Sequence, residues 1–154
     1  MNKLWIGLGA VAFAEAVALV VTFFKPRTPR NAPLEQDTVI MAGAVDSFEP
    51  GSVTAFVRGK FYLARLDNGG FLALSRTCTH LGCTVPWVED ESRFVCPCHS
   101  SAFDLNGDVL APPAPRAMDL FEVSISNGQV SVDTGKRIKR TAFEPGQAVY
   151  PGRA

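Results

Sequence analysis

The sequence predicts a small all-β domain, an antiparallel sandwich or barrel, preceded by one N-terminal transmembrane helix. The first residues are almost wholly apolar, a proline-rich stretch follows, and short apolar segments then alternate with turn signals. Lys plus Arg and Asp plus Glu both number 15, so the chain lacks the basic excess of a nucleic-acid-binding protein. We expect a transmembrane anchor, a hinge or linker, a β domain and an extended tail, at residues 1–24, 25–38, 39–134 and 135–154.

The N-terminal segment has the length and composition of a membrane span. From Leu4 to Phe24 its only charged residue is Glu15, and such a run suits a hydrocarbon core of roughly 30 Å. A cleaved signal peptide is the alternative, but its apolar part is normally shorter and ends at a small-x-small site, whereas this run leads directly into Lys25. Because a charge is costly in lipid, we expect Glu15 to face another helix or a polar cavity.

The segments on either side of the β domain read as irregular chain. Pro26, Pro29 and Pro33 favour an extended linker, whose reach would be about 35–40 Å. The tail contains a basic run from Lys136 to Arg140, followed by Pro and Gly. We expect this tail to lie extended on a partner or in solvent.

Short strands separated by turn residues make up the predicted β domain. Turn signals include Glu49-Pro-Gly51, Asp67-Asn-Gly-Gly70 and Asn127-Gly128. No segment of the domain has a convincing helical pattern. We expect strands at Val39–Val45, Val53–Val57, Phe61–Leu66, Phe71–Arg76, Phe94–Cys96, Leu120–Ile125 and Val130–Asp133.

All four cysteines and both histidines lie between Cys78 and His99. In an ordinary enzyme these residues would be scattered, so their confinement indicates a single site. Two structural disulfides would explain the cysteines but not the histidines. The residues form two segments, Cys-Thr-His-Leu-Gly-Cys from Cys78 to Cys83 and Cys-Pro-Cys-His-Ser-Ser from Cys96 to Ser101.

Two ligand chemistries fit a set of two cysteines and two histidines. A tetrahedral zinc ion can take this set, although zinc sites usually pair cysteine with cysteine and histidine with histidine. Here each segment supplies one cysteine and one histidine at a short spacing. A dinuclear iron–sulfur centre, with two thiolates on one iron and two imidazoles on the other, fits the count equally well.

The two segments resemble the cluster-binding motifs of the Rieske iron–sulfur proteins of quinol:cytochrome c and cytochrome b6f complexes. The resemblance covers roughly residues 39–134 and the single N-terminal anchor. It implies a Rieske-type β domain that carries one [2Fe–2S] cluster. By matching position, Cys78 and Cys96 would bind one iron, and His80 and His99 the other.

The resemblance also implies a disulfide between Cys83 and Cys98. Rieske ferredoxins and ring-hydroxylating oxygenases generally lack this pair, so its presence points to the quinol-oxidising branch of the family. Ala111-Pro-Pro-Ala-Pro115 matches the proline loop that covers the cluster in the family. Its prolines remove backbone donors and fix the shape of a lid.

Two departures from the family pattern concern the redox potential. Ser100 stands where the family often has Gly, and Phe103 stands where it often has a Tyr that donates to a ligand sulfur. Ser101 is retained and could donate to a bridging sulfide. Because hydrogen bonds to sulfur stabilise the reduced cluster, we expect a potential below the ubiquinol-oxidising extreme, within about −150 to +300 mV. Such a potential suits menaquinol better than ubiquinol.

The resemblance implies an electron-transfer function within a larger enzyme. His99 would dock a quinol hydroxyl and accept its proton while the cluster accepts one electron. The domain would then move on the linker, residues 25–38, to reach a c-type cytochrome, and a cytochrome b-type membrane subunit would take the second electron. The alternatives are a Rieske subunit of another membrane oxidoreductase, arsenite-oxidase-like for example, that does not oxidise quinol directly, and a Rieske ferredoxin or assembly component.

The sequence gives opposing indications of the side of the membrane on which the β domain lies. Lys25, Arg27 and Arg30 follow the span and only Lys3 precedes it, so the positive-inside rule places the domain in the cytoplasm. No twin-arginine signal precedes the span. A disulfide and quinol oxidation both favour the outer face. We expect a single-pass protein of the inner, cytoplasmic membrane with its domain on the periplasmic face.

Overall fold

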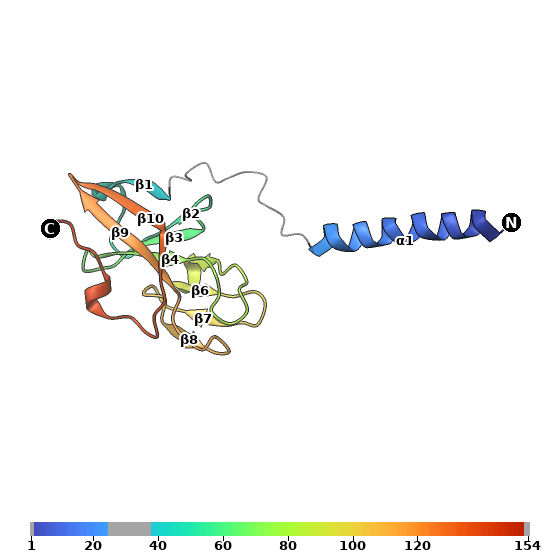
Figure 1. Ribbon diagram of the computed structural model, residues 1–154. Coiled ribbons are helices and arrows are strands. Elements are labelled where there is room, and N and C mark those ends of the chain that lie inside the picture. Colours follow the sequence, from blue (N-terminus) through green and yellow to red (C-terminus); the bar gives the residue numbers. More distant parts are fainter. Residues whose placement is uncertain (1, 25–37, 153–154) are drawn as a thin grey trace. The chain divides into compact units, whose positions relative to one another are not determined.

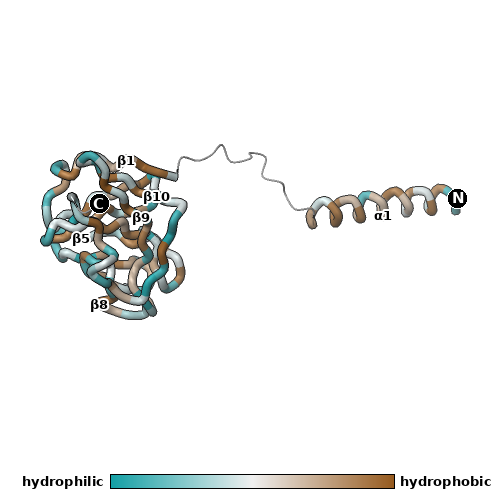
Figure 2. Tube along the Cα trace, turned by 60° about the vertical axis from the view of Figure 1, so that its left-hand side comes forward, coloured by the Kyte–Doolittle hydropathy of each residue, from teal (hydrophilic) through white to brown (hydrophobic). Residues whose placement is uncertain are grey.

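The computed structural model describes residues 2–24 and 38–152, which belong to two units, a helix and a β domain. Helix α1 spans Asn2–Phe24 and has 23 residues. At 1.5 Å per residue its length is about 34 Å, which is enough to cross a hydrocarbon core. Its most apolar window has a mean hydropathy of 2.2, and Figure 2 shows apolar residues along the whole helix. Residues 25–37 of the predicted linker lie outside the described residues.

The β domain consists of two antiparallel sheets (Figure 1). The larger sheet has the strand order β1-β10-β9-β4-β3-β2, with strands at Val39–Ala44, Gln129–Ile138, Leu120–Ser126, Phe71–Ser75, Phe61–Arg65 and Val53–Phe56. The smaller sheet has the order β5-β6-β7-β8, with strands at Trp87–Val88, Arg93–Val95, Ala102–Phe103 and Val109–Ala111. In sequence it is inserted between β4 and β9. This architecture confirms the predicted fold class.

The central strands of the larger sheet are buried on both faces. In β3, Phe61 and Leu63 belong to one apolar core, whereas Tyr62 and Ala64 belong to the other. Strand β4 alternates in the same way, and all five of its residues are buried. Because side chains alternate between faces, a strand covered on both sides reads as a continuous apolar run. The core that contains Tyr62 also packs under the smaller sheet, so it supports the Cys/His segments.

The tight turns lie where the sequence predicts them. Asn127 and Gly128 connect β9 to β10 with φ of 51° and 71°, and two positive φ angles are what a two-residue hairpin turn requires. Between β3 and β4, Gly69 has a φ of 85°, and the side chain of Asn68 accepts a hydrogen bond from the Gly70 amide at 3.1 Å. The described part of the domain has three short 3-10 turns and no α-helix.

The structure differs from the sequence predictions in the smaller sheet and in the tail. Strands β5, β7 and β8 were not predicted, and β10 continues to Ile138 rather than ending at Asp133. The described part of the tail packs on the domain instead of extending into solvent, and Val149 pairs with Phe71. Arg140 in the basic run is only 7% exposed, because its guanidinium donates to backbone carbonyl groups inside the domain.

Candidate metal centre

The two predicted Cys/His segments form turns of the same shape. In the first loop, the Cys78 amide donates to the Cys83 carbonyl at 2.7 Å, and the Gly82 amide donates to the Cys78 carbonyl at 3.0 Å. In the second loop, the Cys96 amide donates to the Ser101 carbonyl at 2.8 Å, and the Ser100 amide donates back to the Cys96 carbonyl at 3.0 Å. Each loop therefore holds its first cysteine at the base of a closed turn.

Gly82 and Ser100 occupy the same position in these two turns. Their φ angles are 82° and 60°, both in the left-handed region. Gly adopts this conformation without a steric penalty, whereas a side chain makes it costly. The family preference for Gly at the position of Ser100 thus has a local physical reason.

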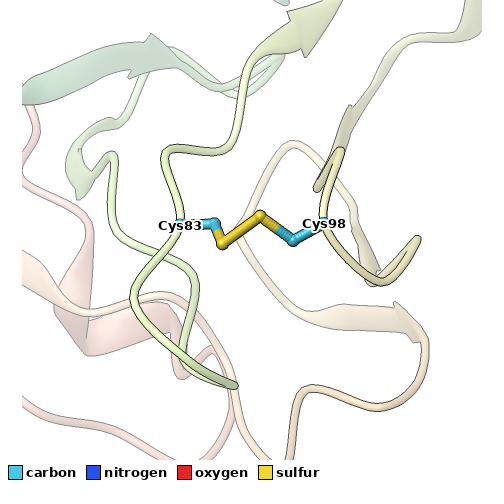
Figure 3. Close-up of a disulfide and its surroundings, with 2 residues drawn as sticks. All are labelled: Cys83 and Cys98. Carbon is cyan, nitrogen blue, oxygen red and sulfur yellow. A yellow bond between two sulfur atoms is a disulfide. The ribbon is translucent and has the colours of Figure 1, made fainter.

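A disulfide joins the two loops. Cys83 and Cys98 are bonded through their sulfur atoms at 2.13 Å (Figure 3). The pairing is the one that the family resemblance implies. It crosses directly from the first loop to the second, so the segments on either side are held next to each other.

Cys78 and Cys96 carry the remaining, unpaired thiols. They are 3% and 2% exposed. Burial raises the pKa of the Cys78 thiol, and the adjacent Cys96 thiol raises it further, whereas the hydroxyl of Ser101 lowers it. Without metal the Cys78 thiol therefore keeps its proton more firmly than an ordinary thiol, and both thiols would have to lose their protons on binding, since metal binding requires the thiolate.

The sulfur atoms of Cys83, Cys96 and Cys98 also lie within 4.8 Å of one another. Two of these three are oxidised to the disulfide and have no thiolate to offer. We therefore assign no metal to that group of three. The free thiols of Cys78 and Cys96 are the sulfur ligands that this end of the domain can supply.

The two imidazoles lie next to each other and are less buried than the two thiols. The ring centres of His80 and His99 are 4.9 Å apart and the rings are nearly perpendicular, at 86°. His80 is partly buried and His99 is exposed. The donor set is therefore graded from two buried thiols to two less buried imidazoles, which fits a dinuclear centre with chemically different ends better than a single symmetric ion.

The proline loop, taken with the following Arg116 as residues 111–116, contacts both Cys/His loops. The backbone amide of Ala114 donates to the hydroxyl of Ser101 at 3.0 Å, and the hydroxyl of Thr79 donates to the carbonyl of Arg116 at 2.7 Å. Ser101 and the proline loop are predicted from the sequence, whereas Thr79 is not. No sequence signal marked Thr79, because it reads as the spacer in a Cys-x-His motif.

Comparison with known proteins gives the same assignment. Residues 38–133 match the model of the Rieske [2Fe-2S] domain family. The chain is 33% identical over 143 residues to the cytochrome b6-f complex iron-sulfur subunit 2 of Nicotiana tabacum, covering 84% of this chain and 62% of that protein. The cytochrome b6-f complex iron-sulfur subunit of Synechococcus sp. (strain WH7803) is 32% identical over 144 residues, covering 86% of this chain and 81% of that protein.

A solved structure also matches the β domain. The cyanobacterial plasma membrane Rieske protein PetC3 from Synechocystis PCC 6803 superimposes with a TM-score of 0.50 at 28% identity, covering 60% of this chain and 97% of that one. The family model, the relatives and the donor set of two free thiols and two imidazoles agree. This chain belongs to the Rieske [2Fe–2S] protein family.

Proposed function

We propose that the chain is the electron-transfer subunit of a cytochrome bc-type complex, and that it accepts one electron from a quinol and passes it to a c-type cytochrome. The observation that carries the proposal is a pair of buried thiols and a pair of less buried, adjacent imidazoles, in loops joined by a disulfide. The relatives that are cytochrome b6-f iron-sulfur subunits support it. The chain spans 62% of the tobacco relative, and it would form one part of the enzyme rather than an enzyme alone.

Four side chains would hold the cluster. Cys78 and Cys96 would bind the inner iron as thiolates, and His80 and His99 would bind the outer iron. Neutral imidazoles leave the centre less negative than four thiolates would, so the bound cluster supplies a one-electron acceptor of comparatively high potential. The hydroxyl of Ser101 lies beside Cys78, where it can donate a hydrogen bond toward sulfur.

His99 would receive the quinol. Its imidazole is exposed, so the ring nitrogen that is not bound to metal can accept a hydrogen bond from a quinol hydroxyl and then hold its proton. Leu81, next to His80, is 69% exposed and gives the rim of the site an apolar contact for a lipid-soluble substrate. A menaquinol is the substrate that suits the modest potential expected with Phe103.

Helix α1 would anchor the chain in the inner membrane beside a cytochrome b-type subunit. The proposed path requires the domain to meet both a quinol at the membrane and a soluble or tethered c-type cytochrome. The linker at residues 25–38 would allow that movement. A disulfide persists in oxidising compartments, and this supports placing the domain on the periplasmic face.

An inhibitor of the quinol-oxidation site tests the proposal. Native membranes that contain all partners of the protein are reduced with ascorbate, and the EPR spectrum of the cluster is recorded with and without the inhibitor. A bound inhibitor that contacts the imidazole of His99 should shift the g-values. Substituting His99 with Cys or Gln cannot serve as the test, because loss of a ligand would remove the signal itself.

The same measurement separates the alternative functions. A Rieske subunit of another oxidoreductase would give the spectrum but no inhibitor-dependent shift. An unshifted spectrum in complete membranes would therefore contradict quinol oxidation at His99 while leaving the cluster in place.

A further inference from the structure

The proline loop, residues 111–116, is bonded to both ligand-bearing loops at points next to the proposed ligands. Thr79, whose hydroxyl donates to the Arg116 carbonyl at 2.7 Å, lies between Cys78 and His80. Ser101, whose hydroxyl accepts from the Ala114 amide at 3.0 Å, is fully buried. A displacement of the proline loop would therefore be transmitted to both loops.

Arg116 ends the proline loop and is held by a buried carboxylate. Its Nη1 donates to Oδ1 of Asp119, and its Nη2 lies 3.3 Å from Oδ2 of the same residue. The Asp119 side chain is 1% exposed and that of Arg116 is 29% exposed. A two-point contact between a guanidinium and a carboxylate fixes orientation as well as adding energy.

Asp119 is itself fixed to the larger sheet. Its Oδ2 accepts a hydrogen bond from Nε of Arg137 in β10 at 2.9 Å. Its backbone carbonyl accepts from the amide of Ser75 in β4 at 2.7 Å. A buried carboxylate is tolerated only when it is paired and hydrogen-bonded, and two guanidinium groups satisfy this one.

We propose that Arg116 is a positioning residue. Through its ion pair with Asp119 it holds the proline loop against the larger sheet, and the proline loop in turn holds both ligand-bearing loops in place around the cluster. This inference rests on the proposed function, in which those loops hold the cluster. The Arg116–Asp119 ion pair, which is remote from the ligands in sequence, would thereby control the geometry of the ligand-bearing loops and so the redox potential of the cluster.

The test compares variants of the full-length protein in solubilised membranes. Arg116→Gln removes the charge and one arm of the fork, and Arg116→Lys keeps the charge but not the fork. Arg93→Gln is the matched control, because the Arg93–Glu91 pair is exposed, with side chains at 44% and 46%. The measurements are the midpoint potential of the cluster, its EPR g-values and the rate of iron loss to a chelator.

We expect Arg116→Gln to shift the potential and the g-values and to accelerate iron loss about 10-fold. Arg116→Lys should show a smaller change, and Arg93→Gln none. A lower unfolding temperature with unchanged potential and g-values would show that the ion pair only stabilises the fold, which would overturn the proposal.

A second variant covers the case in which Arg116→Gln fails to fold. Thr79→Val removes the bond to the proline loop but leaves Arg116 and Asp119 in place, and it should shift the g-values and speed iron loss as well. A Thr79→Val protein with wild-type potential, spectrum and iron retention would contradict the coupling. Absence of a Rieske-type EPR signal from the wild-type protein would instead overturn the proposed function, and the inference with it.

Discussion

Ser100 holds the position in the second loop that Gly82 holds in the first, and both residues have a left-handed backbone. A side chain in this conformation costs roughly 1–2 kcal/mol, and Gly recovers only part of that cost because it loses more conformational entropy on folding. We expect Ser100→Gly to stabilise the domain by about 0.5–1 kcal/mol. Thermal unfolding of the full-length protein measures it.

Gly82→Ala is the reciprocal variant, and we expect it to destabilise the domain. A Cβ atom at Gly82 would meet only a Thr77 methyl group at 4.0 Å, so backbone strain alone should lower its unfolding temperature. If Ser100→Gly were less stable than wild type, the hydroxyl of Ser100 would have to make a contact that outweighs the strain.

Phe103 is fully buried in β7, at the position where related proteins often have a tyrosine. A hydroxyl that donates to a ligand sulfur stabilises the reduced state of the cluster. We expect Phe103→Tyr to raise the midpoint potential by roughly 40 mV, the equivalent of about 1 kcal/mol for one hydrogen bond in a one-electron couple. A redox titration followed by EPR measures the change, and Phe94→Tyr, in the neighbouring strand β6, is the control. An equal rise in both variants would mean that polarity, not a specific bond, sets the potential.

At the scale of elements, the disulfide between the two loops is a crosslink over a sequence separation of 15 residues. Constraining the unfolded chain over such a loop is worth about 3 kcal/mol. The double variant Cys83→Ser/Cys98→Ser should unfold at lower denaturant concentration by this amount. It should also lose its visible circular-dichroism signal before the far-ultraviolet signal, because the loops separate first. Simultaneous loss at the wild-type midpoint would show that the two loops hold together without the bond.

Arg140 is one of the residues that attach the C-terminal segment to the domain, beside the backbone pairing of Val149 with Phe71. Its Nε donates to the carbonyl of Met118 at 2.8 Å, its Nη1 donates to the side chain of Gln147 at 2.9 Å, and its Nη2 donates to the carbonyl of Asn106. Burial lowers the pKa of the guanidinium, because removal from water disfavours its charged form. The three hydrogen bonds offset this desolvation cost.

Replacing Arg140 should weaken the attachment of this segment near Asn106 and Met118 and leave its pairing with Phe71 in place. We expect Arg140→Gln to destabilise the domain by about 2–4 kcal/mol, because buried carbonyl groups lose their donors. The exposed neighbour Lys139 is the control, and Lys139→Gln should change stability by less than about 0.5 kcal/mol. Chemical denaturation measures both. Equal effects would indicate that the overall charge of the basic run matters rather than the buried guanidinium.

At the scale of the whole molecule, Glu15 in α1 is a candidate contact with a partner subunit in the membrane. It lies near the middle of α1, where an ionised side chain facing lipid would cost several kcal/mol. In the proposed complex, we expect Glu15→Leu to reduce the amount of cytochrome b-type subunit that co-purifies with the protein, because the partner would lose a polar contact, whereas Glu15→Gln should retain it. Val17→Leu, on the opposite side of the helix, is the control. Unchanged co-purification of Glu15→Leu would show that the carboxyl group does not contact the partner.

The long strands and the choice of site residues could be predicted because their signals are local. The apolar runs of β3 and β4 and the Asn-Gly turn at residue 127 are visible in a few consecutive residues. The Cys/His segments carry their spacing in the sequence, and the structure brings those residues together at one end of the domain.

The remaining features depend on pairing between distant segments, which single-sequence patterns do not record. Strands β5 and β7 have two residues each, too few for a period to appear. Arg140 is buried only because Asn106 and Met118 present carbonyl groups to it, so its basic run reads as solvent-exposed. Asp119 reads as an ordinary surface acid until Arg116 and Arg137 are placed around it.

The short separation between the Cys96 sulfur and the disulfide, under 4.8 Å, bears on how the protein matures. A thiolate so close to a disulfide is positioned to attack it and exchange partners. Cysteine bound to metal is not available for that reaction. We therefore expect a productive order of events in which metal is loaded while the chain is reduced, and the crosslink is closed afterwards. In a chain that is oxidised first, the Cys96 thiolate can attack this disulfide and take the place of Cys83 or Cys98, which leaves as a thiolate. Cys96 would then be bonded in the disulfide and could not bind metal.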